Sequence, residues 1–153
     1  MSKKRVKFLR RMRAIPLALV LTLVLVAPLA LATCQHCNDG VFTTACALAE
    51  YPIEAKGMVT MRADITWRMC IVFYFDSDII PIGCTVPRTR SGTEVVPLIP
   101  PEPPSYRIGV TVEGQYLSGG GGGRTPPPEL LSSGWVTDSS ATAIEDCYGY
   151  CEI

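Results

Sequence analysis

The chain has 153 residues, 48% of them hydrophobic, and its 14 basic residues balance its 14 acidic residues. Seven basic residues and no acidic ones lie in the first 32 positions, which leaves seven basic against 14 acidic residues, a formal charge of −7, on residues 33–153. This charge argues against a nucleic-acid partner, because proteins that bind nucleic acid present basic surfaces to it.

The first 32 residues predict an export signal. A basic head leads into an apolar run, and the small residues Ala30 and Ala32 are typical of a cleavage site. We expect cleavage after Ala32 on the general secretory route, which divides the chain into a signal peptide at 1–32 and a single exported domain at 33–153. The alternative is an uncleaved anchor, because about 20 apolar residues can span a bilayer.

Residues 31–34, Leu-Ala-Thr-Cys, resemble the lipobox of bacterial lipoproteins, whose cysteine is lipidated and becomes the first mature residue. The resemblance departs at Thr33, where that family usually has Gly, Ala or Ser. A lipid on Cys34 would anchor the protein without a spanning helix. Lipidation of Cys34 is therefore an alternative to ordinary cleavage.

All seven cysteines lie beyond the leader: Cys34, Cys37, Cys46, Cys70, Cys84, Cys147 and Cys151. In an oxidising compartment most of them should form disulfides, and an odd number leaves one unpaired. Lipidation would make Cys34 the odd one and leave six for three disulfides. The sequence does not decide how Cys37, Cys46, Cys147 and Cys151 pair.

The first strong strand signal covers residues 59–69, where odd positions are apolar and even positions are polar. Alternation of period two predicts a half-buried strand. Both faces then become apolar as far as Phe75, and residues 76–78 supply turn chemistry. Residues 79–86 are predicted to return as a second strand, and Pro81 puts that strand at a sheet edge or breaks it, because proline cannot donate to the ladder.

This hairpin predicts one disulfide from its register. A three-residue loop makes three pairs of residues face each other: Phe75 and Ile79, Val72 and Ile82, Cys70 and Cys84. Opposed Cα atoms in a non-hydrogen-bonded antiparallel pair are about 4.5 Å apart, a separation that a disulfide accepts. We therefore expect Cys70 and Cys84 to be bonded.

The later elements complete a mostly β pattern. Residues 94–99 predict a short strand, prolines within 100–104 form a stiff connector, and residues 106–116 predict a longer strand. A Gly/Pro-rich loop at 118–128 follows, and residues 139–146 are compatible with a brief helix. Together these features predict a small antiparallel sandwich or open barrel, stapled by disulfides, with irregular termini.

The cysteines at the two ends of the domain offer a metal-binding or thiol-redox alternative. Five residues would supply soft ligands for zinc or copper: Cys34, His36, Cys37, Cys147 and Cys151. The spacing of Cys34 and Cys37 is also that of thiol-redox enzymes, but those enzymes place the pair at the start of a helix that follows a strand. Because exported thiols are normally oxidised, we expect structural staples and no cofactor.

Catalytic arrangements find little support. His36 is the only histidine and lies at the start of the predicted domain, where it is a poor base for a Ser-His-Asp site. The carboxylates of Asp76 and Asp78 are explained by a turn. Those of Glu145 and Asp146 are explained by a solvated helix end, so a secreted hydrolase is the least favoured interpretation.

The aromatic residues admit a binding role, although packing in the core or against disulfides is the favoured interpretation. Trp67 is predicted to lie in the core, whereas Trp135, Tyr148 and Tyr150 fall in irregular segments, where they either pack locally or meet a partner. We therefore expect an exported cysteine-rich β domain with a structural or interaction role at the cell envelope or outside the cell. Its partner would be a protein or surface ligand, and membrane anchoring would come from Cys34 or an uncleaved signal.

Overall fold

A computed structural model describes residues 33–119 and 134–153. The predicted signal peptide at 1–32 and residues 120–128 of the predicted Gly/Pro-rich loop lie outside the described residues, so cleavage or retention of the leader stays a prediction. Within the described ranges, no helix has the length and hydropathy needed to cross a membrane.

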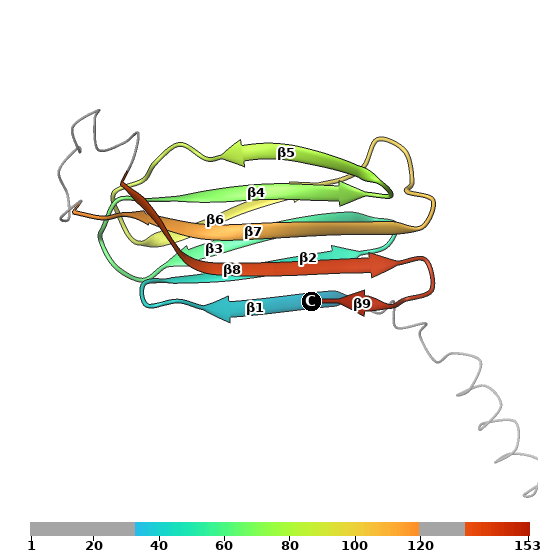
Figure 1. The fold of residues 1–153 in the computed structure, drawn as a ribbon, viewed down its shortest axis with the longest axis horizontal. Helices are drawn as coiled ribbons and strands as arrows, with labels where there is room; N and C mark the ends of the chain where they lie inside the picture. The colour runs from blue at the N-terminus through green and yellow to red at the C-terminus, as the bar shows by residue number, and fades with distance from the viewer. Residues whose placement is uncertain (1–32, 120–133) are drawn as a thin grey trace, which may run out of the picture. The chain divides into compact units, whose positions relative to one another are not determined.

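The described residues form two antiparallel sheets packed face to face (Figure 1). The strands are β1 (Cys34–Asp39), β2 (Thr43–Glu50), β3 (Glu54–Met61), β4 (Trp67–Phe75), β5 (Asp78–Cys84), β6 (Gly92–Leu98), β7 (Arg107–Leu117), β8 (Trp135–Asp146) and β9 (Cys151–Glu152). One sheet has the order β1-β2-β3-β6 and the other the order β5-β4-β7-β8-β9. The predicted antiparallel sandwich is confirmed, and the open-barrel alternative is not the one the chain adopts.

The core lies between the sheets, which contribute side chains of different size. β4 turns its odd positions inward, and Trp67 and Phe73 are fully buried there. The inner face of β2 consists largely of alanines, and at Gly57 of β3 even a Cβ would collide with Cδ1 of Ile71. Small residues on one sheet make room for large ones on the other, and burial of each large side chain stabilises the fold by about 1.5–3 kcal/mol.

The continuous strand predicted for residues 59–69 is wrong. β3 ends at Met61 and belongs to one sheet, whereas β4 begins at Trp67 and belongs to the other. The alternation survives the crossing because odd positions face the shared core in both strands. A period-two pattern reports which face is buried, and it does not report which sheet the strand joins.

The β4–β5 hairpin differs locally from its predicted register. Phe75 pairs with Asp78, so the loop has two residues and not three, and Val72 pairs with Pro81 and not with Ile82. Asp76 adopts a φ of 53°, the left-handed conformation that two-residue hairpin loops require. An irregularity between Ile71 and Val72 then shifts the register by one residue, and Cys70 lies opposite Cys84.

Two of the four edge strands, β5 and β6, each carry a proline. The expectation that Pro81 marks an edge is confirmed, because β5 lies at the end of its sheet. Pro97 lies in β6, at the end of the other sheet. Proline removes a backbone donor that an added strand would need, so these edges are poor templates for strand addition.

The termini are strands, which corrects the expectation of irregular ends and of a brief helix at 139–146. Residues 139–146 belong to β8, whose odd positions point into the sandwich. The inward residues there are Ser139, Ala141, Ala143 and Glu145, and their low hydrophobicity hides the alternation. β1 and β9 then bring the two ends of the domain together.

Three disulfides join the described cysteines: Cys34–Cys151, Cys37–Cys46 and Cys70–Cys84. The first links β1 to β9 and so joins the two sheets, with a Cα–Cα distance of 5.3 Å. The others each lie within one sheet, at 4.1 and 4.0 Å.

The lipidation alternative for Cys34 is not the one that the described structure adopts. Lipidation requires an unpaired Cys34, but Cys34 is bonded to Cys151, and Cys147 is the free, exposed cysteine among the described residues. A sulfur atom in a disulfide cannot also carry the thioether of a lipid. The structure therefore uses Cys34 as a staple between the sheets.

Loss of the disulfide between the sheets is expected to destabilise the protein more than loss of the one inside the first hairpin. The chain-entropy model gives about 5 kcal/mol for Cys34–Cys151, with a sequence separation of 117, and about 2.5 kcal/mol for Cys37–Cys46, with a separation of 9. Denaturant unfolding of the double variants Cys34→Ser/Cys151→Ser and Cys37→Ser/Cys46→Ser measures both losses. Equal losses would contradict the expected order.

Candidate functional site

The terminal cysteines do not assemble a metal site. Side chains alternate between faces along β1, so Cys34 and His36 point to one side and Cys37 to the other. Of the four candidate cysteines, Cys147 alone is free, since the other three are in disulfides. Among the described residues, no three His, Cys, Asp or Glu side chains come together as metal ligands. Cys34 and Cys37 are bonded to other partners and so do not form a redox pair with each other.

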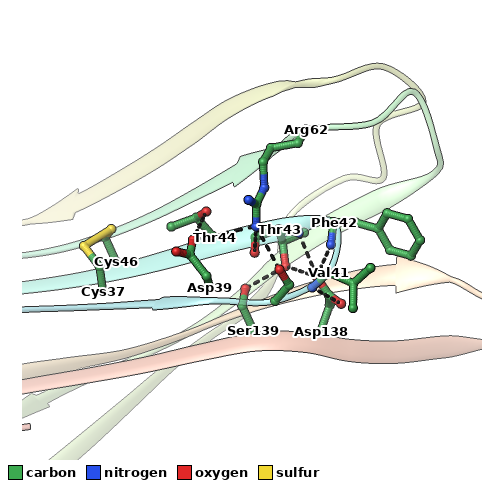
Figure 2. Close-up of polar contacts among 11 residues, drawn as sticks. Cys37, Asp39, Val41, Phe42, Thr43, Thr44, Cys46, Arg62, Asp138 and Ser139 are labelled. Atoms are coloured by element: carbon green, nitrogen blue, oxygen red, sulfur yellow. Dashed lines mark hydrogen bonds and ion pairs between the residues drawn. A yellow bond between two sulfur atoms is a disulfide. The ribbon is translucent and has the colours of Figure 1, made fainter.

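A dense polar cluster holds the β1–β2 turn against β8 (Figure 2). The Asp138 carboxylate accepts hydrogen bonds from the backbone N–H groups of residues 41–43 at 3.0, 2.8 and 2.7 Å, and from the Thr43 hydroxyl at 2.8 Å. Gly40 is needed here because a Cβ would collide with Asp138. Arg62 donates to the Gly40 carbonyl at 2.8 Å from the other side. All of these donors stabilise one turn, so the cluster is a brace for the turn.

Three further aspartates brace turns in the same way. Asp76 accepts the backbone N–H groups of Ser105 and Tyr106 at 2.9 and 2.8 Å. Asp146 accepts two N–H groups of the turn at 147–150, at 2.9 and 2.8 Å. Asp64 accepts both the N–H and the hydroxyl of one serine, each at 2.7 Å. The contacts of Asp64 and Asp76 connect loops that are distant in the sequence, whereas Asp146 fixes the turn that directly follows it.

Neither carboxylate pair considered for hydrolysis is arranged as an acid and a base. Asp76 faces the backbone of the proline connector, whereas Asp78 is exposed at the start of β5. Glu145 and Asp146 are consecutive residues of β8, so their side chains point to opposite faces. The expected solvated helix end is wrong at Glu145, which is only 4% exposed.

The brace formed by Asp138 predicts acid sensitivity. Burial alone would raise the pKa of Asp138, but the hydrogen bonds from Thr43, Phe42 and Val41 outweigh it and hold that pKa below its ordinary value. Its stabilising contribution is therefore present above the unfolded-state pKa and is lost as pH falls through the folded-state pKa.

We expect Asp138→Asn to lower the free energy of unfolding by about 2 kcal/mol at neutral pH, the range for hydrogen bonds to charged groups. The difference from wild type should shrink in acid, as denaturant unfolding at several pH values would show. Asp39→Asn is the matched control, since Asp39 is exposed and accepts no backbone N–H group of the turn: its contacts are an ion pair of 3.7 Å with Arg62 and a hydrogen bond of 2.5 Å from the Thr44 hydroxyl. A pH-independent loss at Asp138 would argue against a charge-based brace.

Four loops meet at one end of the sandwich, on the right in Figure 1, which we call the loop end. The loop end consists of residues 51–53, 76–77, 99–106 and 147–150. The Tyr51 hydroxyl donates to the carbonyl of Pro104 at 2.8 Å, and the Cys147 N–H donates to the carbonyl of Tyr106 at 2.7 Å. With the braces at Asp76 and Asp146, these bonds hold all four loops against one another.

The braced loops present apolar and aromatic side chains to solvent. Tyr148 and Tyr150 are 91% and 76% exposed, and Ile99 is 70% exposed. Ile53 and Tyr106 add smaller exposed surfaces. The sequence pointed to the two tyrosines of the turn, but the other three residues had no local signal because the loops that carry them meet only in the folded sandwich.

The two tryptophans do not belong to this surface. Trp67 is fully buried, as predicted, and its indole N–H donates to the carbonyl of Arg90 at 2.8 Å. Trp135 is partly buried at the start of β8, where the guanidinium of Arg68 lies 4.1 Å from its ring centroid. Of the two alternatives for Trp135, local packing is therefore the one observed, and the residue lies in a strand and not in an irregular segment.

Glu145 lies beneath the loop end. Its carboxylate accepts the Tyr51 N–H at 2.7 Å. Burial raises the pKa of Glu145, and the nearby charges of Glu50 and Asp146 raise it further, against the effect of the Tyr51 hydrogen bond. A carboxyl with a raised folded-state pKa contributes stability below its unfolded-state pKa and loses it as pH rises through the folded-state value.

Glu145→Gln is therefore expected to increase stability at neutral pH, because glutamine keeps an acceptor for Tyr51 without a buried charge. The gain should disappear in acid, where Glu145 is itself protonated. Denaturant unfolding from acid to neutral pH measures this difference in stability. The exposed Glu102→Gln is the control for the loss of one charge. A gain of equal size at every pH would contradict the assignment.

The negative charge of the domain is concentrated at the loop end. Eight acidic side chains lie within or next to its loops: Glu50, Glu54, Asp76, Asp78, Glu102, Glu145, Asp146 and Glu152. Arg107 is the only base in the described segments 50–54, 76–78, 99–107 and 145–152, and Lys56, just beyond them, forms an ion pair of 2.6 Å with Glu54. Four arginines, at 62, 68, 88 and 90, lie at the opposite end. The loop end therefore favours a cationic partner.

No protein-family model matches the chain, and neither a curated protein nor a solved structure is significantly similar to it.

Proposed function

We propose that this protein is an exported interaction module that binds a protein partner through its loop end, at the cell envelope or outside the cell. Three disulfides fit a small extracellular cysteine-rich domain, because such bonds persist in oxidising compartments. We further propose that residues 1–32 act as the signal for export, and that the role is not catalytic.

The observation that carries the proposal is the exposure of Tyr148 and Tyr150 on a turn that is held rigid. Asp146 fixes the backbone of that turn, and the N–H of Cys147 donates to the carbonyl of Tyr106, which follows the proline connector. Tyrosine supplies a large amphipathic contact surface with few rotatable bonds. Because the loops are ordered before binding, little conformational entropy remains to be lost when a partner binds.

Site-specific photocrosslinking tests this proposal in cells that produce and export the full-length chain. With p-benzoylphenylalanine in place of Tyr148, we expect a covalent adduct to one identifiable protein. The same photoreactive residue at Val41, which is 78% exposed in the β1–β2 turn at the other end, should give no adduct to that protein.

The identified partner then provides a quantitative readout with purified proteins. Tyr148→Ala together with Tyr150→Ala should weaken its binding about thirtyfold, the effect of losing an aromatic hot spot of about 2 kcal/mol. Adducts of equal yield from positions 41 and 148, or unchanged affinity of the tyrosine variant, would contradict a binding role for the loop end.

A further inference from the structure

A pocket of about 370 Å³ lies between the β4–β5 turn and the proline connector, at the loop end. Phe75 and Ile80 from the hairpin and Pro101 from the connector give it apolar walls. The carboxyl-bearing residues Asp78 and Glu102 line it as well, one from each side. A third acidic residue, Asp76, also lines the pocket, which thus combines apolar walls with three acidic residues.

The carboxylates of Asp78 and Glu102 differ from the other acid in the pocket. Asp76 is engaged by backbone N–H groups of the connector, which hold its pKa below the ordinary value. Asp78 and Glu102 are exposed, and neither side-chain carboxylate has a hydrogen bond or ion pair to another described residue. Two negative charges at this pocket therefore have no counterion in the described part of the chain.

We propose that this pocket receives the lysine or arginine side chain of a basic segment on the partner protein. These side chains place an aliphatic stem on apolar surface and keep a charged head at the rim, which matches prolines and Phe75 next to two unpaired carboxylates. The proposal rests on the proposed function, since it names the chemistry of the partner that the loop end binds.

The charge distribution of the domain supports a basic occupant. The loop end carries the large acidic excess, so a cationic segment is attracted toward it before contact. The exposed rings of Tyr148 and Tyr150 belong to the same end, and aromatic faces also attract guanidinium and ammonium groups.

Binding of a defined probe tests the proposal on protein purified from cells that export the full-length chain. The probe is a fluorescein-labelled Gly/Ser peptide with several arginines, and its control is the same peptide with citrulline in place of arginine, which keeps the shape and removes the charge. We expect the arginine peptide to bind and to shift the NMR amide signals of Ile80 and Glu102, while the citrulline peptide does neither.

Two matched double variants distinguish binding at the pocket from attraction by the overall negative charge of the loop end. Asp78→Asn/Glu102→Gln should weaken binding of the arginine peptide about fivefold, as expected for two exposed ion pairs. Glu50→Gln/Glu152→Gln removes the same charge at the same end without touching the pocket, and should change binding less than about twofold at physiological salt. Equal weakening by the two variants, or binding of the citrulline peptide, overturns the pocket proposal.

The outcome also separates this proposal from the proposed function. If the protein captured at position 148 binds the Asp78→Asn/Glu102→Gln variant as tightly as wild type, the pocket proposal is overturned and the interaction role of the loop end stands. If the arginine peptide binds at the pocket but position 148 captures no protein, the pocket is supported and the role of the tyrosines is not.

Discussion

The close approach of the two sheets, made possible by small residues opposite large ones, governs the rest of the structure. At Gly57 a Cβ would meet Ile71, and at Gly114 it would meet the hydroxyl oxygens of Thr43 and Ser139 at 2.8 Å. Those two hydroxyls, from opposite sheets, share a hydrogen bond of 2.6 Å. The same closeness lets Asp138 of one sheet reach the turn between two strands of the other. Packing of the core therefore decides where the polar braces can form.

The braces show how an acidic domain uses its charge. Asp64, Asp76, Asp138 and Asp146 each accept backbone or hydroxyl hydrogen bonds from a turn, which gives four of the 14 acidic residues a structural role. A carboxylate that accepts several N–H groups satisfies donors that a loop would otherwise expose to solvent. Loops fixed in this way can present Tyr148 and Tyr150 as a preformed surface, which is the property that a binding role needs.

In the hairpin between β4 and β5, the sequence predicts the correct cysteine pair from an incorrect loop length. The loop is one residue shorter than the expected three, and a register shift near Ile71 adds one residue back on the β5 side, so the two deviations cancel at Cys70 and Cys84. In the same way, the alternation through residues 59–69 identified the buried faces and missed the crossing between sheets. Among the candidate site residues, Tyr148 and Tyr150 could be named from the sequence, whereas the pocket beside Asp78 and Glu102 could not.

The sequence by itself determined the β class, the buried faces of the main strands, the edge position of Pro81 and the expectation of disulfides, because period-two alternation, proline chemistry and cysteine number are local properties. Only the tertiary structure decided that Cys34 pairs with Cys151 and leaves Cys147 free, that Glu145 is buried, and that four loops form one acidic, tyrosine-bearing end. The cysteine pairing, the burial of Glu145 and the meeting of the loops all depend on which strands become neighbours and which sheet each strand joins. Strand order is set by contacts between residues far apart in the chain, and no local pattern contains it.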